Sequence, residues 1–140
     1  MALLLVIEPI FVVNLHKAGA SLDFLGFTFR FDRHRRGGGR YLNIVPSTQA
    51  MNRVRRRLRE MTQRRVQQPL AEVIGKLNRY LRGWRNYFSF GYPRLACKKV
   101  NWYVQTRLRC FMRTRSRRRG RQLEGPSRYQ ALRSQGLIYL

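Results

Sequence analysis

Acidic residues are scarce in this sequence, and their scarcity sets the character of the whole chain. Its 140 residues include 6 Asp and Glu against 30 Lys and Arg, which gives a net charge of +24 and a pI of about 11.8. A charge of this size opposes compaction unless a polyanion neutralises it, so nucleic acid is the expected partner. Arginine accounts for 26 of the 30 cations, and its planar guanidinium both binds phosphate through paired hydrogen bonds and stacks on bases. This bias favours nucleic acid over a membrane surface.

Cysteine and histidine are almost as rare, with two residues of each type. Cys97 and Cys110 lie 13 residues apart in a predicted helix, where they point in different directions and cannot form a disulfide. They are interpreted as small apolar residues in a reducing compartment, and we expect a cytoplasmic location. His16 and His34 are distant from both cysteines in sequence, so no zinc site is expected, and no cofactor is predicted.

Long hydrophobic runs are also missing. The opening MALLLVIEPIFVVNL is apolar, but it has no basic start, and Glu8 and Pro9 interrupt it. It is shorter than the roughly 20 residues that a membrane-spanning helix needs. We therefore predict one or two buried strands here rather than a signal peptide or anchor, and no membrane association.

Alternating apolar and polar residues then predict a β-hairpin. In DFLGFTFRF, which starts at Asp23, Phe27, Phe29 and Phe31 fall on one side of a half-buried strand. The Gly-rich basic loop RHRRGGGR follows, and the alternation resumes in RYLNIV, which ends at Val45. The glycines lack the strand-to-helix context of a phosphate-binding loop, so the loop is interpreted as a flexible basic finger.

The next segment predicts an arginine-rich helix. Pro46 ends the strand, and Ser47 is suited to cap a helix that begins near Thr48. An apolar seam follows with spacings of 3, 4 and 3 residues, and it consists of Met51, Val54, Leu58 and Met61. Seven arginines accompany a single Glu60, which is placed to pair at i, i+4 with Arg56 or Arg64. This excess of positive charge predicts contact with phosphate.

Residues 70–88, LAEVIGKLNRYLRGWRNYF, form the best-determined helix of the sequence. Its apolar residues recur at steps of 3 and 4 and form one stripe, made of Leu70, Val73, Ile74, Leu77, Leu81, Trp84 and Phe88. Lys76, Arg79 and Arg82 lie outside this stripe. Gly83 has two interpretations, either a close approach of backbone or a neighbouring helix, or a tolerated helix glycine.

A third helix is predicted over about residues 95–115, after a turn at SFGYPR. Its expected core residues are Cys97, Val100, Val104, Leu108 and Phe111. Trp102 lies on the opposite face with Arg109 and Arg113, where it either packs against the C-terminal tail or the strands, or stacks on RNA. The basic segment from Thr114 is expected to order on an anion, and RYQALRSQGLIYL is expected to dock back on the helices.

Several of these strings together resemble the C-terminal part of group II intron-encoded reverse transcriptase–maturases. They are VNLHKAG, DFLGFTFR with its basic hairpin, VPS with the arginine-rich helix, LNRYLRGWRNYF and RYQALRSQGL. The FLGF string resembles the last strand region of the reverse transcriptase palm, and the portion from about Pro46 resembles the maturase-specific, or X, domain that forms a helical thumb. The resemblance covers roughly residues 12–140, and its most specific motif is LRGW at residues 81–84.

The resemblance implies an α+β fold, with a short strand segment followed by a three-helix thumb-like bundle and a basic tail. Residues 1–45 would be a truncated remnant of the palm, and residues 46–140 the maturase-specific domain. The family's polymerase uses paired aspartates that hold two magnesium ions, but residues 1–45 contain only Glu8, Asp23 and Asp32. No polymerase or other enzyme activity is therefore expected of this chain, because in the family the intron RNA performs the splicing chemistry.

The expected function is binding of group II intron RNA to assist its folding and splicing, with a palm-containing reverse transcriptase as a further partner. The predicted RNA contacts are Arg53, Arg56, Arg57, Arg64, Lys76, Arg79, Arg82, Trp102, Arg109 and Arg113. Three alternatives stay open: a DNA-binding three-helix domain, a ribosomal-type structural protein, and a non-functional fragment of a degenerate intron-encoded protein.

Overall fold

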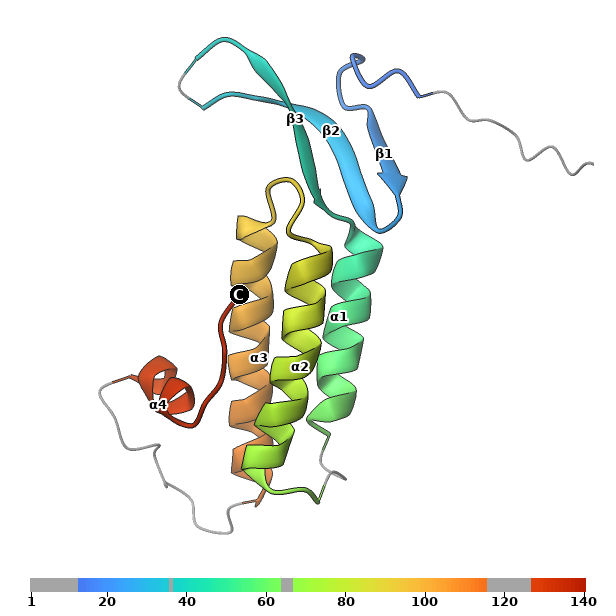
Figure 1. Cartoon of the computed structure of the whole chain (residues 1–140). Coiled ribbons are helices and arrows are strands. Elements are labelled where there is room, and N and C mark those ends of the chain that lie inside the picture. Colours follow the sequence, from blue (N-terminus) through green and yellow to red (C-terminus); the bar gives the residue numbers. More distant parts are fainter. Residues whose placement is uncertain (1–12, 36, 64–66, 116–126) are drawn as a thin grey trace, which may run out of the picture.

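The computed structural model describes residues 13–35, 37–63, 67–115 and 127–140, in which a small sheet lies at one end of a helical bundle (Figure 1). The elements are β1 (Ser21–Phe24), β2 (Phe27–Arg33), β3 (Arg40–Pro46), α1 (Thr48–Met61), α2 (Leu70–Tyr87), α3 (Arg94–Arg115) and α4 (Arg128–Ser134). The expected α+β class, with strands before helices, is confirmed. The strands predicted within residues 1–12 and the anion-ordered segment 116–126 lie outside the described residues.

The three strands form an antiparallel sheet in the order β1-β2-β3. Phe29 pairs with Leu22 of β1 and with Ile44 of β3. Because cross-strand partners point to the same side of a sheet, apolar residues of all three strands share one face. The β2–β3 hairpin and the alternation along it are confirmed, with Arg33 opposite Arg40 before the glycine-rich tip.

The FLGF string holds a turn that the sequence analysis did not separate from the strand. Leu25 and Gly26 both have positive φ, of 49° and 82°. Two consecutive left-handed residues match the twist of a tight β-hairpin, so Phe24 closes β1 and Phe27 opens β2. The interpretation of DFLGFTFRF as one strand is therefore wrong at this turn.

One apolar stripe from each long helix builds the bundle core. Leu58 of α1, Leu77 and Leu81 of α2, and Leu108 of α3 have no exposed surface. The remaining core residues on the three helices are Ala50, Val54, Val73, Ile74, Trp84, Val100, Val104 and Phe111, with Phe88 just after α2. The predicted stripes are confirmed, although four of their residues are only partly buried against the core: Met51, Met61, Leu70 and Cys97.

Helix boundaries follow from capping chemistry. The Ser47 hydroxyl accepts a hydrogen bond from the Ala50 amide (3.2 Å), as expected of an N-cap.

The turn between α2 and α3 contains Gly91, at φ +85°, where an added Cβ would clash with the carbonyl oxygen of Ile44. Glycine at this position lets the turn reach β3, and the Tyr92 amide donates to that carbonyl (2.8 Å).

The sheet is joined to the bundle on a second side by aromatic packing. The Phe27 ring lies 5.0 Å from that of Phe88 and 5.6 Å from that of Tyr87. The Tyr87 hydroxyl donates to the Leu25 carbonyl (2.7 Å). The sheet is thus attached both at the β1–β2 turn and at β3.

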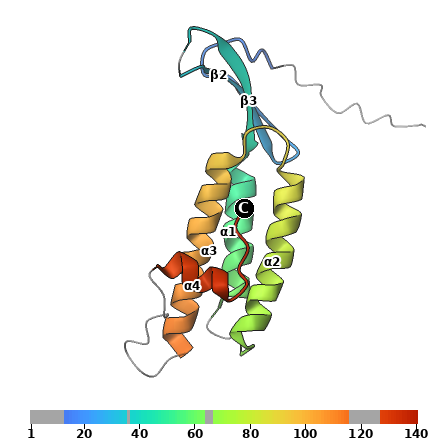
Figure 2. The same ribbon diagram turned by 60° about the vertical axis from the view of Figure 1, so that its left-hand side comes forward.

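The C-terminal segment packs back on the bundle, as the sequence predicted, and runs along α2 and α3 in both views (Figures 1 and 2). Leu132 of α4 and Leu137 are buried against the core. Asn78 of α2 donates to the Gly136 carbonyl (2.7 Å) and accepts from the Ile138 amide (3.0 Å). Asn101 of α3 makes the same pair of bonds with both backbone groups of Leu140.

Candidate nucleic-acid interface

The outer surface of α1 is cationic. Val54 and Leu58 point into the core, which leaves Arg53, Arg56 and Arg57 exposed. Glu60 pairs with Arg57 at 3.1 Å, three residues away, rather than with Arg56 at i, i+4. Both partners are about half exposed, with 56% and 44% of their side-chain surface accessible. A pair this exposed contributes little to stability, and it neutralises only one of the arginines.

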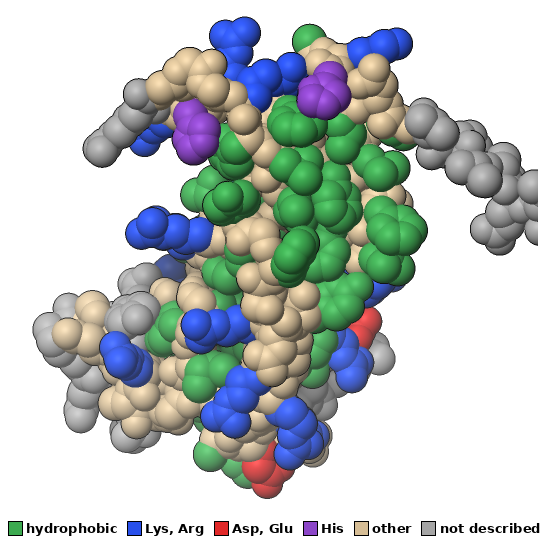
Figure 3. Space-filling model, turned by 45° about the horizontal axis from the view of Figure 1, so that its top comes forward, with side chains coloured by type: hydrophobic (Ala, Val, Ile, Leu, Met, Phe, Trp, Pro, Cys, Tyr) green, Lys and Arg blue, Asp and Glu red, His purple; other side chains and the backbone are tan. Residues whose placement is uncertain are grey.

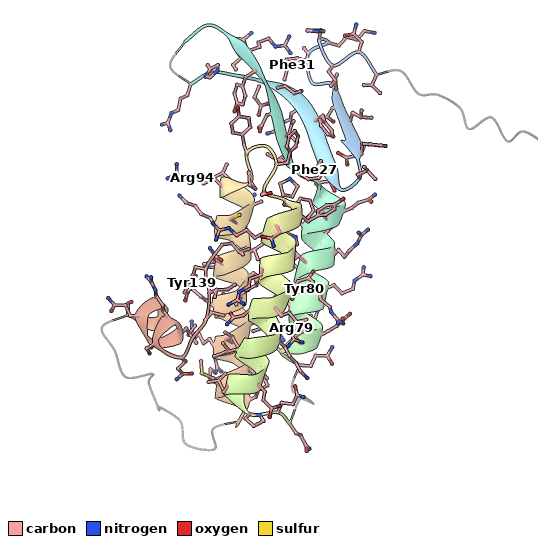
Figure 4. The ribbon with its side chains drawn as sticks, viewed as in Figure 1. Phe27, Phe31, Arg79, Tyr80, Arg94 and Tyr139 are labelled. Carbon is pink, nitrogen blue, oxygen red and sulfur yellow. The ribbon has the colours of Figure 1, made fainter. Side chains whose placement is uncertain are left out.

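Tyr80 links this surface to α2. Burial raises the pKa of its phenol, and the positive charges of Arg57 and Arg53 partly oppose that increase. These electrostatic interactions place both arginines of α1 close to Tyr80 of α2. Figure 4 labels Tyr80 and its neighbour Arg79 on α2. The structure therefore brings two of the candidate residues of α1, Arg53 and Arg57, close to α2.

The three predicted cations of α2 are exposed, as expected. Lys76 donates from Nζ to Oε1 of Gln68 (2.8 Å), while Arg79 and Arg82 project from the outer face of the helix. An added Cβ at Gly83 would meet nothing within 4 Å. Gly83 therefore does not serve the close approach of a neighbouring helix within the described chain.

The α3 candidates lie on a separate surface. Trp102, Arg109 and Arg113 are exposed on the face opposite Val104 and Leu108. The indole of Trp102 is 68% exposed. Neither the strands nor residues 127–140 cover Trp102, because the latter are bound through Asn101 and Asn78. The part of the tail at residues 116–126 lies outside the described residues, so that alternative stays open there.

Four further cations complete this account of the positive charge. Arg64 lies outside the described residues. Arg107 is half-buried and donates hydrogen bonds to Thr62, the C-cap residue of α1, so it joins α3 to α1. Lys98 and Lys99 were missed, although both are exposed and lie four and three residues before Trp102. Residues three and four positions apart lie on the same side of a helix, so the spacing of these lysines from Trp102 could have identified them from the sequence.

The sheet presents an apolar surface instead of a cationic one. Figure 3 shows hydrophobic side chains gathered over the sheet, with Lys and Arg at the margins. The strand register assigns this apolar face to Leu22, Phe24, Phe27, Phe29, Phe31, Leu42 and Ile44. Phe24 is 59% exposed and Leu42 39%. Exposed apolar patches of this kind are typical of interaction sites.

Within the described ranges there is no group of three or more His, Cys, Asp or Glu residues that could hold a metal ion. None of the helices in those ranges is long and apolar enough to cross a membrane.

Comparison with protein families bears on the helical part. The family model described as "Group II intron, maturase-specific domain" matches residues 51–129, which is more than half of the chain. The match begins inside α1 and ends inside α4, so it contains the cationic surfaces of α1, α2 and α3 but not the sheet. A search among curated proteins found no relative. Maturase-specific domains are not themselves catalytic. The chain belongs to the family of group II intron maturase-specific domains, and its function is of the maturase type, in the splicing of group II introns.

Proposed function

We propose that this chain binds group II intron RNA through its cationic helix surfaces and stabilises the compact RNA fold that splices. The observation that carries the proposal is the exposed cationic surface of α1 and α2, where Arg53 and Arg57 lie close to Tyr80 and where Glu60 is the one carboxylate of α1. Arg56, Lys76 and Arg79 are exposed on the same two helices. Intron RNA supplies the splicing chemistry, and the protein supplies charge neutralisation and positioning.

The physical mechanism is counterion release. Each phosphate that an arginine neutralises frees a condensed cation, so binding weakens as salt is added. With about 6 to 10 phosphate contacts, affinity falls about 10³- to 10⁵-fold between roughly 50 and 200 mM salt. Only two ion pairs, Arg30–Asp32 and Arg57–Glu60, are formed among the described residues. Most of the exposed guanidinium groups are therefore unpaired with carboxylates and available to phosphate.

Filter binding at several salt concentrations tests the proposal. Group II intron RNA is compared with an unrelated structured RNA and a duplex DNA of similar length. A steep salt dependence and a preference for the intron are expected. Equal affinity for all three would contradict intron recognition, and stronger binding of the duplex would favour the DNA-binding alternative.

Charge-removing variants identify the surface. Replacing Arg53, Arg56 and Arg57 together by Gln should lower the magnitude of the salt slope by about 2 to 3. Arg30→Gln is the matched control, because Arg30 lies on the sheet and already pairs with Asp32 at 3.1 Å. Its slope should equal that of the wild type. An unchanged slope in the triple variant would show that RNA binds elsewhere.

We further propose that the chain lacks polymerase activity and that a palm-containing reverse transcriptase covers the apolar sheet face. Primer extension by the purified chain should be undetectable. Size-exclusion chromatography with a separately expressed palm segment should show a complex, and Phe29→Ser should abolish it. A complex that withstands this change would place the contact elsewhere.

A further inference from the structure

Trp102 carries an exposed side chain that the described residues do not cover. The two tryptophans differ sharply, since Trp84 is 7% exposed in the core whereas Trp102 is 68% exposed on the outside of α3. Thr106 donates from its hydroxyl to the Trp102 carbonyl (3.0 Å), which secures the backbone but leaves the ring uncovered. A large apolar ring held in water on a rigid helix is typical of a binding contact.

The surroundings of the ring indicate what it binds. Lys98 and Lys99 lie one turn before Trp102, and Arg109 lies two turns after it. All three are exposed. No acidic residue occurs in α3 (Arg94–Arg115). Cations at helical spacing on both sides of an aromatic ring match a nucleotide chain, in which phosphates flank each base.

We propose that the outer face of α3 binds an unpaired segment of RNA, with one base stacked on Trp102 and the neighbouring phosphates on Lys98 and Lys99. A base within a duplex is already stacked on its neighbours and is not free to cover the indole, so the site selects single-stranded loops or bulges. An acidic protein would also be attracted to the lysines, but it does not supply negative charges on both sides of a planar ring, as a nucleotide chain does. The inference rests on the proposed function, because it takes RNA to be the ligand.

Tryptophan fluorescence tests the proposal, because only one of the two tryptophans, Trp102, is exposed to a ligand. An eight-nucleotide single-stranded RNA of A and U is titrated into the full chain, and a 16-base-pair blunt RNA duplex serves as the comparison. Stacking on the exposed indole should quench tryptophan emission with the single strand and leave it nearly unchanged with the duplex. Equal quenching by both RNAs, or quenching by neither, would overturn the stacking site.

Matched substitutions separate stacking from other contacts. Trp102→Leu keeps apolar bulk without a π-face, and it should weaken binding of the single strand by about 5- to 150-fold. Trp102→Phe keeps a ring and should retain most of the affinity. Equal loss of affinity in both variants would contradict base stacking, because the phenyl ring of Trp102→Phe also offers a face on which a base can stack. Far-UV spectra of both should match the wild type, since the side chain is exposed.

The lysines give an independent readout. Replacing Lys98 and Lys99 together by Gln should lower the salt slope for the single strand by about 1.4 and leave emission quenching at saturation intact. Failure of the stacking site can be distinguished from failure of the proposed function. If intron RNA binds but Trp102→Leu has wild-type affinity for the single strand, only the stacking site is wrong. If no RNA binds in a salt-dependent way, the proposed function itself fails.

Discussion

Arg107 of α3 holds the C-terminal end of α1 through Thr62. Its Nε donates to the Thr62 hydroxyl (3.0 Å), and its Nη2 donates to the Thr62 carbonyl (3.1 Å). Thr62 is 2% exposed and caps α1, with its own hydroxyl donating to the Leu58 carbonyl (2.7 Å). One arginine of this basic chain is therefore committed to joining two helices.

We expect Arg107→Gln to lower the free energy of unfolding by about 1–3 kcal/mol, because a buried carbonyl would lose its partner. Urea unfolding measures the change. Arg55→Gln on the exposed surface of α1 is the control, and it should stay within about 0.5 kcal/mol of the wild type. Equal stability of the two variants would show that the Thr62 bonds contribute nothing.

The two asparagines that bind the C-terminal segment should act as a clamp. Asn78→Ala and Asn101→Ala each remove a donor and an acceptor, and all the backbone groups involved except the exposed Gly136 carbonyl are partly buried. Each substitution should therefore cost about 1–3 kcal/mol. Hydrogen exchange should accelerate at the Ile138 amide in the first variant and at the Leu140 amide in the second. Asn52→Ala, on the exposed surface of α1, should change neither amide.

Replacement of Gly91 and of Gly83 by alanine should change the stability of the fold in opposite directions. Gly91→Ala places a Cβ against the Ile44 backbone at a positive φ, so it should destabilise the fold by more than about 1 kcal/mol. Gly83→Ala meets open space in the middle of α2 and should stabilise it by about 0.5–1 kcal/mol. Thermal unfolding at fixed salt measures both. The same sign for both substitutions would contradict the geometry.

Alkaline pH should destabilise the fold through Tyr80. Burial raises the pKa of this phenol above its ordinary value of 10.0, so the folded chain holds the proton more tightly than the unfolded chain. The resulting stabilisation is fully present below pH 10.0 and is lost as the pH rises through the raised pKa. Tyr80→Phe has no proton to lose. The free energy of unfolding of the wild type should therefore fall relative to Tyr80→Phe above pH 10.0, and parallel pH curves would refute this.

The helical part was largely predictable because its signals are local. Spacings of 3 and 4 residues located the buried stripes, and the Ser47 cap was found from residue type alone. The turn at Leu25 and Gly26 was missed because leucine gives no sign of a positive φ, which the adjoining strands impose on it.

The sequence predicted which side chains of the candidate site are exposed, but not which of them lie close together in space. Periodicity placed Arg56 and Arg79 on outer faces, but only the packing of α2 on α1 shows that Arg53 and Arg57 adjoin Tyr80. The role of Arg107 depends on Thr62, which lies 45 residues away in sequence. Contacts of such long range leave no periodic signal in a single chain.

The double attachment of the sheet has a mechanical consequence. The hairpin is braced at Leu25 by Tyr87 and at Ile44 by Tyr92, and these braces sit at the C-terminal end of α2 and just before α3. A single attachment would act as a pivot, whereas two attachments, one in the β1–β2 turn and one on β3, resist rotation. A force applied at the tip of the β2–β3 hairpin should therefore rotate the sheet and the helices together as one rigid body.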